Sequence, residues 1–174
     1  SPNNYSLIRT ADDVTLTAQQ VTQGADSKIQ ADTLTVLTQQ GALLAGANSV
    51  NTFSAFNALF GDVAFNNASS LLTVTGVDAA SSNLTLSQAG DLLVTGLVMS
   101  GPQTIATTGK LTVLGDAANS GQLSAFGGQT ISAHAIDVVA QDGGSAFIGN
   151  DGAGDQVITV AGGGSSAGLD VRTV

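Results

Sequence analysis

The segment GNDGAGDQV, at residues 149–157, places two carboxylates among glycines. Asp151 and Asp155 lie four positions apart, and the glycines between them leave backbone carbonyls open to an ion. Carboxylate and carbonyl oxygens are the ligands of Ca²⁺, and calcium-binding solenoids repeat a nonapeptide rich in glycine and aspartate. This segment occurs once, and its glycine spacing differs from that repeat. Asp151 and Asp155 are therefore calcium candidates, but we favour a solvated turn and expect no cofactor.

Acid–base chemistry would need His134 or the adjacent pair Asp12 and Asp13. His134 alternates with Ile131 and Ala133, so a strand would turn the imidazole outward. We favour a surface or ladder histidine over a member of a Ser-His-Asp site. Adjacent carboxylates in a strand point to opposite faces, so Asp12 and Asp13 are poorly placed as an acid–base pair. The sequence indicates that the chain is not an enzyme.

Three Asn-x-Ser/Thr sequons begin at Asn4, Asn67 and Asn83. Such sequons are acceptors for sugars on asparagine. Because the chain is rich in Asn, Ser and Thr, three matches arise readily by chance, and we favour that interpretation. The intact mass of the native protein tests it directly.

The composition indicates strands and tight corners. The 174 residues are 43% hydrophobic and include 22 glycines, but there is no Glu, Trp or Cys. Helical surfaces are normally covered by Glu, Lys and Arg, whereas the polar residues here are Ser, Thr, Asn, Gln and Asp. We therefore expect an all-β domain with a substantial core.

The charge balance excludes several classes of partner. Only four basic residues oppose 13 Asp, and the net charge is −9. Such a chain has no basic patch for nucleic acid or for anionic lipid. No apolar run reaches transmembrane length. The first residues lack a signal peptide, so an export signal would have been removed or would lie outside this segment.

A repeat of about 20 residues organises the chain. Strand-like runs begin at spacings of 19 or 20, and a looser 22-residue step separates Ile136 and Ile158. The regular starting positions are Val14, Leu34, Phe53, Leu72, Leu92, Leu111 and Ile131.

A parallel β-solenoid explains this spacing because each repeat then forms one coil that stacks on the next. Turn pairs typical of hairpins are scarce between the early strands, which argues against a β-sandwich. We predict about eight coils of roughly 19–22 residues. Inward columns would contain Leu72, Leu92 and Leu111, with Val74, Val94 and Val113 beside them.

The stretch VNTFSAFNALF, at residues 50–60, fits this pattern less well. Val50, Phe53, Phe56 and Phe60 recur every three or four residues, as they would on one side of a helix. We favour a wide corner whose aromatic rings fill or cap the core, with a short helix as the alternative.

The glycine, polar, apolar coils, the run NNASSLLTVTGV and the late segment from QTISAHAIDVV to SSAGLDV resemble a known family. They are similar to the repetitive stalk of the filamentous-haemagglutinin-like exoproteins of Gram-negative two-partner secretion. The resemblance covers nearly the whole chain. The Asn-Pro-Asn-Gly-Ile type motif of the family's secretion domain is missing, so residues 1–174 look like one segment of a longer stalk.

The resemblance implies a right-handed parallel β-helix that is exported through an outer-membrane partner barrel. It further implies a secreted or cell-surface filament that acts as an adhesin, with neighbouring coils or further copies end to end and host or matrix glycans or proteins as contacts. The alternative function is a carbohydrate-active parallel β-helix, either a glycan hydrolase or a glycan-binding module. A hydrolase would bring several Asp together in one groove.

Overall fold

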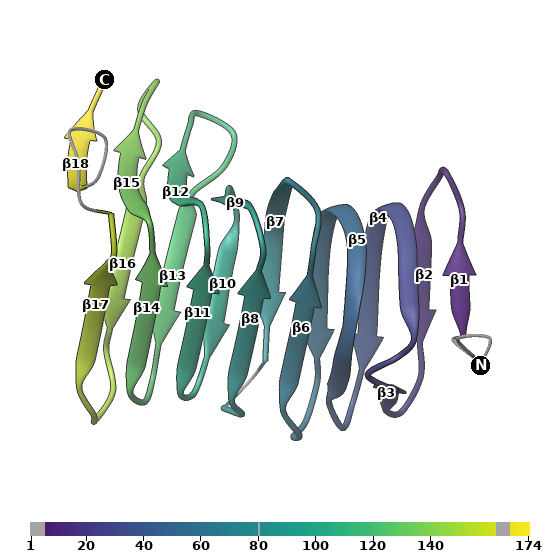
Figure 1. Cartoon of the computed structure of the whole chain (residues 1–174). Helices are drawn as coiled ribbons and strands as arrows, with labels where there is room; N and C mark the ends of the chain where they lie inside the picture. The colour runs from purple at the N-terminus through teal and green to yellow at the C-terminus, as the bar shows by residue number, and fades with distance from the viewer. Residues whose placement is uncertain (1–5, 80, 163–167) are drawn as a thin grey trace.

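The computed structural model describes residues 6–79, 81–162 and 168–174, and the regular structure in these ranges is all strand. The chain winds into a parallel β-solenoid of about seven turns, which confirms the predicted all-β parallel β-helix. Figure 1 shows the turns side by side, from β1 near the N-terminus to β18 near the C-terminus. In the part of the chain that is described, no helix has the length and apolarity needed to cross a membrane.

Each complete turn contains three strand segments, and the stacked segments form three faces. Face 1 consists of β1 (Leu7–Arg9), the start of β4 (Lys28–Thr38), the middle of β5 (Ala42–Asn57), the start of β7 (Leu71–Asp78), β9 (Asp91–Val94), β12 (Lys110–Gly115), β15 (Ala135–Ala140) and β18 (Leu169–Thr173).

Face 2 follows face 1 in every turn. It consists of β2 (Val14–Thr17), the ends of β4, β5 and β7, then β10 (Leu97–Ser100), β13 (Gly121–Ala125) and β16 (Ala146–Asn150).

Face 3 completes the turn. It consists of β3 (Val21–Gln23), the start of β5, β6 (Val63–Asn67), β8 (Leu84–Gln88), β11 (Gln103–Thr107), β14 (Gln129–Ala133) and β17 (Gln156–Val160). The last five of these strands lie side by side in Figure 1.

The core consists of apolar columns that cross the turns. Leu72, Leu92 and Leu111 are paired in register and at most 1% exposed, as predicted from the repeat. Alternate residues of a strand point to opposite sides, so one side chain in two enters the interior. The parallel column of Val74, Val94 and Val113 is buried in the same way.

The simple repeat predicts the wrong neighbours at three places. Phe53 pairs with Val74, not with Leu72. Leu111 pairs with Ile136, 25 residues later, whereas Ile131 belongs to face 3. The 22-residue step between Ile136 and Ile158 is likewise not a turn, because Ile136 pairs with Leu169 and Ile158 with Ile131.

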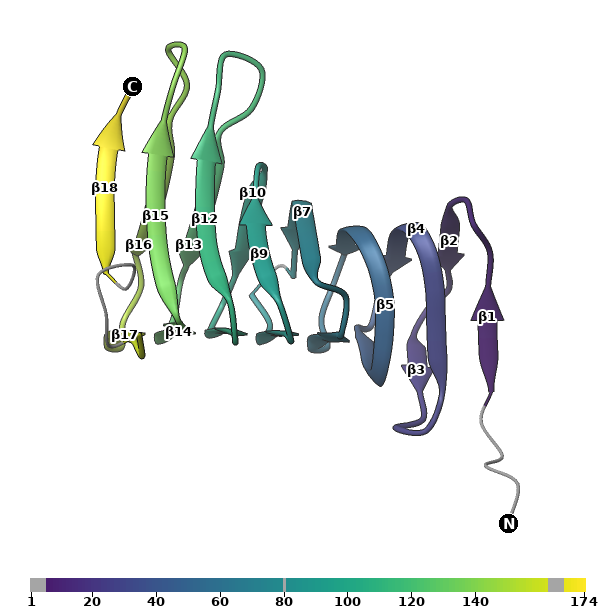
Figure 2. The ribbon, with the colours of Figure 1, turned by 45° about the horizontal axis from the view of Figure 1, so that its top comes forward.

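Longer loops explain both the late change of register and the smaller number of turns. Only Thr95 and Gly96 separate β9 from β10, but residues 116–120 separate β12 from β13 and residues 141–145 separate β15 from β16. These loops project beyond the strands in Figure 2. The extra residues leave the strands in register, so about seven turns form where a constant repeat predicts eight.

Residues 50–57 are extended strand, so the predictions of a corner or a helix there are both wrong. Val50 and Phe53 are buried, whereas Phe56 is 49% exposed and Phe60, in the corner beyond β5, is 58% exposed. Inside the solenoid the ring of Phe53 stacks on that of Phe65, with centroids 4.0 Å apart and planes at 8°. The two-residue alternation of a strand therefore decides that Phe53 is buried and Phe56 is exposed, and helical spacing does not.

Candidate functional site

Asp151 and Asp155 lie in the corner between β16 and β17, and both are exposed. The Nδ2 of Asn150 donates to the carbonyl of Gly154 at 2.8 Å and so closes this corner. The hydroxyl of Ser124, on the preceding turn, donates weakly to Asp151 at 3.4 Å. Among the described residues there is no group of three or more His, Cys, Asp or Glu that could hold a metal. The solvated turn stays our prediction, with calcium at Asp151 and Asp155 as the alternative.

His134 is exposed at the corner between faces 3 and 1, as its alternation predicted. Its backbone N–H donates to Gly109 at 2.9 Å. Asp12 and Asp13 are also exposed, but they lie in the bend between β1 and β2. The prediction that a strand separates their side chains is therefore wrong, because the chain leaves the strand after Arg9. These groups lie in separate corners of the solenoid.

The three sequons occupy different environments. Asn4 lies outside the described residues, Asn67 is fully buried, and Asn83 is exposed. The Nδ2 of Asn67 donates to Gln88 and to Val50, so a sugar on this atom is incompatible with the folded core. The Nδ2 of Asn83 donates to Asp62, which is also exposed, at 2.9 Å in a bond at the surface. Of the two described sequons, Asn83 is the one that a transferase could reach in the folded chain.

A ladder of buried amides was not predicted from the sequence. Asn67 donates from Nδ2 to Gln88 Oε1 of the next turn at 2.9 Å and to the carbonyl of Val50 at 3.1 Å. Its Oδ1 accepts the N–H of Val50 at 3.0 Å. Asn67 also pairs in register with Asn48 of the preceding turn, so the amides stack along the corner between faces 3 and 1.

The first member of this ladder is Gln23. Its Nε2 donates to Asn48 Oδ1 at 2.8 Å, and its Oε1 accepts from Asn48 Nδ2 at 3.1 Å. Asn48 Oδ1 also accepts the backbone N–H of Ile29 at 2.8 Å. The Nδ2 of Asn48 also donates to the carbonyl of Asn66 at 3.0 Å, so Gln23 and Asn48 join the first three turns.

A second ladder begins where face 3 exchanges aliphatic residues for glutamine. The column Val63 and Leu84 continues as Gln103, Gln129 and Gln156. Gln129 is completely buried; its Nε2 donates to Gln103 at 2.8 Å, and it accepts from Gln156 at 2.6 Å. Gln129 and Gln156 therefore each donate to the amide of the turn before, whereas Gln103 donates to Ser100 of its own turn at 3.4 Å.

The ladders satisfy polar groups that would otherwise destabilise the core. In the described part of the chain, no buried side-chain nitrogen or oxygen lacks a hydrogen bond. A buried polar group without a partner costs about 1–3 kcal/mol, whereas a satisfied one contributes modestly to stability. A sequence signal existed, because Asn67 and Gln88 end strands in successive turns, and Gln103, Gln129 and Gln156 begin strands in the three turns that follow. The amides could be assigned to the interior only once the register was known.

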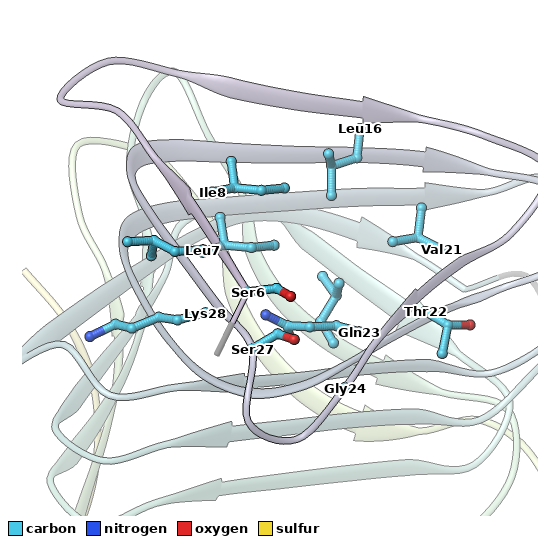
Figure 3. Close-up of a pocket in the computed structure, with 12 residues that line it drawn as sticks. Ser6, Leu7, Ile8, Leu16, Val21, Thr22, Gln23, Gly24, Ser27 and Lys28 are labelled. Carbon is cyan, nitrogen blue, oxygen red and sulfur yellow. The ribbon is translucent and has the colours of Figure 1, made fainter. Parts of the chain in front are cut away.

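A pocket of about 410 Å³ opens into the first turn. Figure 3 shows Leu7, Ile8, Leu16 and Val21 around it, with Lys28 at one side. Three of these apolar side chains occupy the same columns as the buried core of later turns. Ile8 pairs with Ile29, Leu16 with Val36 and Val21 with Ala42, whereas Leu7 pairs with Lys28. The pocket is therefore the interior of the solenoid seen at its first turn.

The surface electrostatics are modest. Lys110 and Asp137 form an ion pair at 3.2 Å on face 1, with the lysine side chain 48% exposed. The backbone N–H groups of Ala118 and Asn119, the former having the larger effect, lower the pKa of Asp116 in the loop after β12. Exposed ion pairs contribute little to stability, so the core and the ladders dominate.

No family model matches this chain, and neither a curated protein nor a solved structure matches it. Function is therefore inferred from the fold, the ladders and the surfaces of the solenoid.

Proposed function

We propose that this chain is a structural and adhesive segment of a secreted bacterial surface fibre. The observation that carries the proposal is the continuity of the core across the turns. For example, the column Leu16, Val36, Ala55, Val77, Val98, Leu123 and Ile148 passes through all of them in register. With strands about 4.8 Å apart, seven turns span roughly 30 Å of rod.

The direction of the hydrogen bonds suits a load-bearing rod. Strand pairing in a parallel solenoid places the N–H···O bonds roughly along the long axis, between one turn and the next. A pull along the axis is then shared by three faces and by the amide ladders inside them. Each buried aliphatic side chain adds about 1.5–3 kcal/mol to the interaction between turns.

The resemblance to the stalks of filamentous-haemagglutinin-like exoproteins supplies the context of the proposal. The resemblance implies that the chain is exported through an outer-membrane partner barrel and stays on the cell surface. It also implies that the chain contacts glycans or proteins of a host or matrix. The alternative of a carbohydrate-active enzyme needs several Asp in one groove. Asp12 and Asp13 lie at a corner of the first turn, whereas Asp151 and Asp155 lie at a corner of the last complete turn. These two pairs of carboxylates are therefore at opposite ends of the solenoid and do not share a groove.

Single-molecule pulling on the chain, with handles at residues 6 and 174, tests the mechanical part. A turn contains 19–27 residues as far as β17, and 33 residues separate the paired positions of β15 and β18, so the release of one turn adds roughly 60–120 Å of contour length. We expect a series of force peaks with increments of that size or small multiples of it. Smooth extension without peaks would contradict a load-bearing role.

Immunogold electron microscopy of the source bacterium, with antibodies against this chain, tests the location. We expect label along thin fibres at the cell surface. Label confined to the cytoplasm would contradict both export and adhesion.

A further inference from the structure

The chain contains two Asp-Gly dipeptides, at residues 142–143 and 151–152. Both lie in corners between strands, and both aspartates are exposed. Because glycine has no side chain, the backbone nitrogen that follows each aspartate is open to the carboxyl carbon of that same aspartate. The sequence therefore gives the two sites the same chemistry, and only the fold distinguishes them.

The first dipeptide forms the tip of a closed turn in the loop between β15 and β16. The N–H of Gly144 donates to the carbonyl of Gln141 at 2.9 Å, and Asp142 and Gly143 are the residues between them. Their φ angles are +51° and +79°. Within the described ranges, Asp142 is the one residue other than glycine with a positive φ, a conformation that is unfavourable for an L-residue. The backbone of Asp142 is therefore strained before any reaction.

Few contacts hold this tip in place. In the part of the chain that the structure describes, Asp142 and Gly143 make no hydrogen bond of their own. A Cβ on Gly143 would meet no atom within 4 Å, and the loop projects beyond the strands in Figure 2. Rotation about the Cα–C bond of Asp142 therefore moves Gly143 through open solvent.

The second dipeptide is packed against the preceding turn. A Cβ on Gly152 would collide with the carbonyl oxygen of Phe126. The N–H of Gly152 donates to Asn150 Oδ1 at 3.3 Å, and the N–H of Asp151 donates to the carbonyl of Ala125 at 2.8 Å. The same rotation at Asp151 would break these contacts, so the fold restrains the nitrogen of Gly152.

We propose that Asp142 is a site of spontaneous isoaspartate formation and that the fold protects Asp151 from the same reaction. The nitrogen of Gly143 forms a bond to Cγ of the protonated Asp142 carboxyl. The Cγ–OH bond breaks, and the hydroxyl leaves as water with the proton of the nitrogen, which gives a cyclic succinimide. Water then opens the ring. Attack at Cγ restores aspartate, whereas attack at the main-chain carbonyl leaves the peptide running through the β-carbon. Water is the one other reactant, and nothing is oxidised or reduced.

The solenoid accommodates this product. Isoaspartate adds one methylene to the main chain, and it does so in a loop that leaves β15 paired with β12 and β16 paired with β13. The α-carboxylate of the product replaces the side-chain carboxylate, so the net charge is unchanged. Isoaspartate should therefore accumulate in folded chains without loss of the fold. The inference does not depend on the fibre role.

Incubation of the full chain at neutral pH and physiological temperature for several weeks tests the proposal. Proteolysis and electron-transfer fragmentation then distinguish isoaspartate from aspartate at each site. We expect at least about tenfold more isoaspartate at residue 142 than at residue 151, which corresponds to about 1.4 kcal/mol in the barrier. The same incubation in guanidinium chloride is the control. With the fold removed, the two dipeptides should react at similar rates.

Asp142→Glu is the matched variant, because a glutamate keeps the charge but would have to close a larger ring. It should form no modified product at residue 142 and leave the low signal at Asp151 unchanged. Circular dichroism and thermal melting establish that the variant is folded. Two results would overturn the proposal. One is isoaspartate at residue 142 in denaturant but not in the folded chain, and the other is equal formation at residues 142 and 151 in the folded chain.

Discussion

Leu92 pairs in register with Leu72 of the preceding turn, and both side chains are at most 1% exposed. Leu111 continues the column into the next turn. The neighbours of Leu92 above and below are therefore leucines, and a charge placed there would lie against hydrocarbon. The adjacent Leu93 points outward between Thr73 and Thr112.

Leu92→Asp should abolish folding. Loss of a buried leucine costs about 2–5 kcal/mol, and an unpaired buried carboxylate adds several more. The sum is comparable with the whole stability of a domain, about 5–15 kcal/mol. Far-UV circular dichroism and thermal melting measure the effect, and Leu93→Asp is the control that should stay folded. A Leu92→Asp variant that melts like the parent would mean that this column is not buried.

Asn67→Ala should destabilise the chain by about 2–4 kcal/mol, because the backbone N–H of Val50 and the Oε1 of Gln88 both lose a partner. Urea unfolding followed by circular dichroism gives the free energy. Asn66→Ala is the matched control, since the Nδ2 of Asn66 makes one exposed bond to Ala45 at 3.3 Å. Equal changes in the free energy of unfolding for the two substitutions would show that the buried ladder contributes no more to stability than an exposed hydrogen bond.

Gly61→Ala should destabilise more than Gly143→Ala. Both glycines have positive φ, +93° and +79°, and both substitutions incur the left-handed penalty of about 1–2 kcal/mol. A Cβ at Gly61 would in addition approach the carbonyl oxygen of Gln40 at 2.3 Å, whereas the space around Gly143 is open. Thermal melting of the two variants separates the steric contribution. If Gly143→Ala is the more damaging of the two, close contact between turns at Gly61 is wrong.

The loop after β12 should lose order in acid. Hydrogen bonds from the N–H groups of Ala118 and Asn119 lower the pKa of Asp116, so the stabilisation is present above the ordinary carboxyl pKa. It disappears as the pH falls through the lowered value in the folded chain. The amide shifts of Ala118 and Asn119 in NMR should titrate with a midpoint below about 3.9, the usual value for Asp.

Asp116→Asn is the control for this titration, because it removes the ionising group and should leave the same two amide shifts constant over that pH range. A midpoint at or above the usual value in the parent would contradict the hydrogen bonds in the loop.

The fold was predictable because its main determinants are local. Glycine-rich corners and alternating apolar residues determine the strands, and their spacing determines the stacking where loops are short, as from Leu72 to Leu111. The predicted register was wrong where a loop contains extra residues, as at 116–120, because the length of a loop has no periodic signal in the sequence. The prediction for residues 50–60 was wrong for a different reason. The three- and four-residue spacing of Phe53, Phe56 and Phe60 is typical of a helix, but it also arises when a strand ends in a corner.

The interior ladders and face 2 were not predictable in the same way. Asn67, Gln88 and Gln129 are polar residues, and composition alone assigns such residues to the surface. Their burial depends on partners 17 to 27 residues away. Leu97 and Gly76 likewise become neighbours on a single face only once the strand registers are known.

Engineered cysteine pairs measure the register of the turns most directly, and the chain has no cysteine of its own. Neighbouring strands are about 4.8 Å apart, which is within the Cα separation that a disulfide spans. Thr112→Cys with Asp137→Cys joins residues paired in the structure, whereas Thr112→Cys with Ser132→Cys follows a constant 20-residue repeat. We predict rapid oxidation of the first pair and none of the second; cross-linking of the second pair alone would contradict the stacked turns described above.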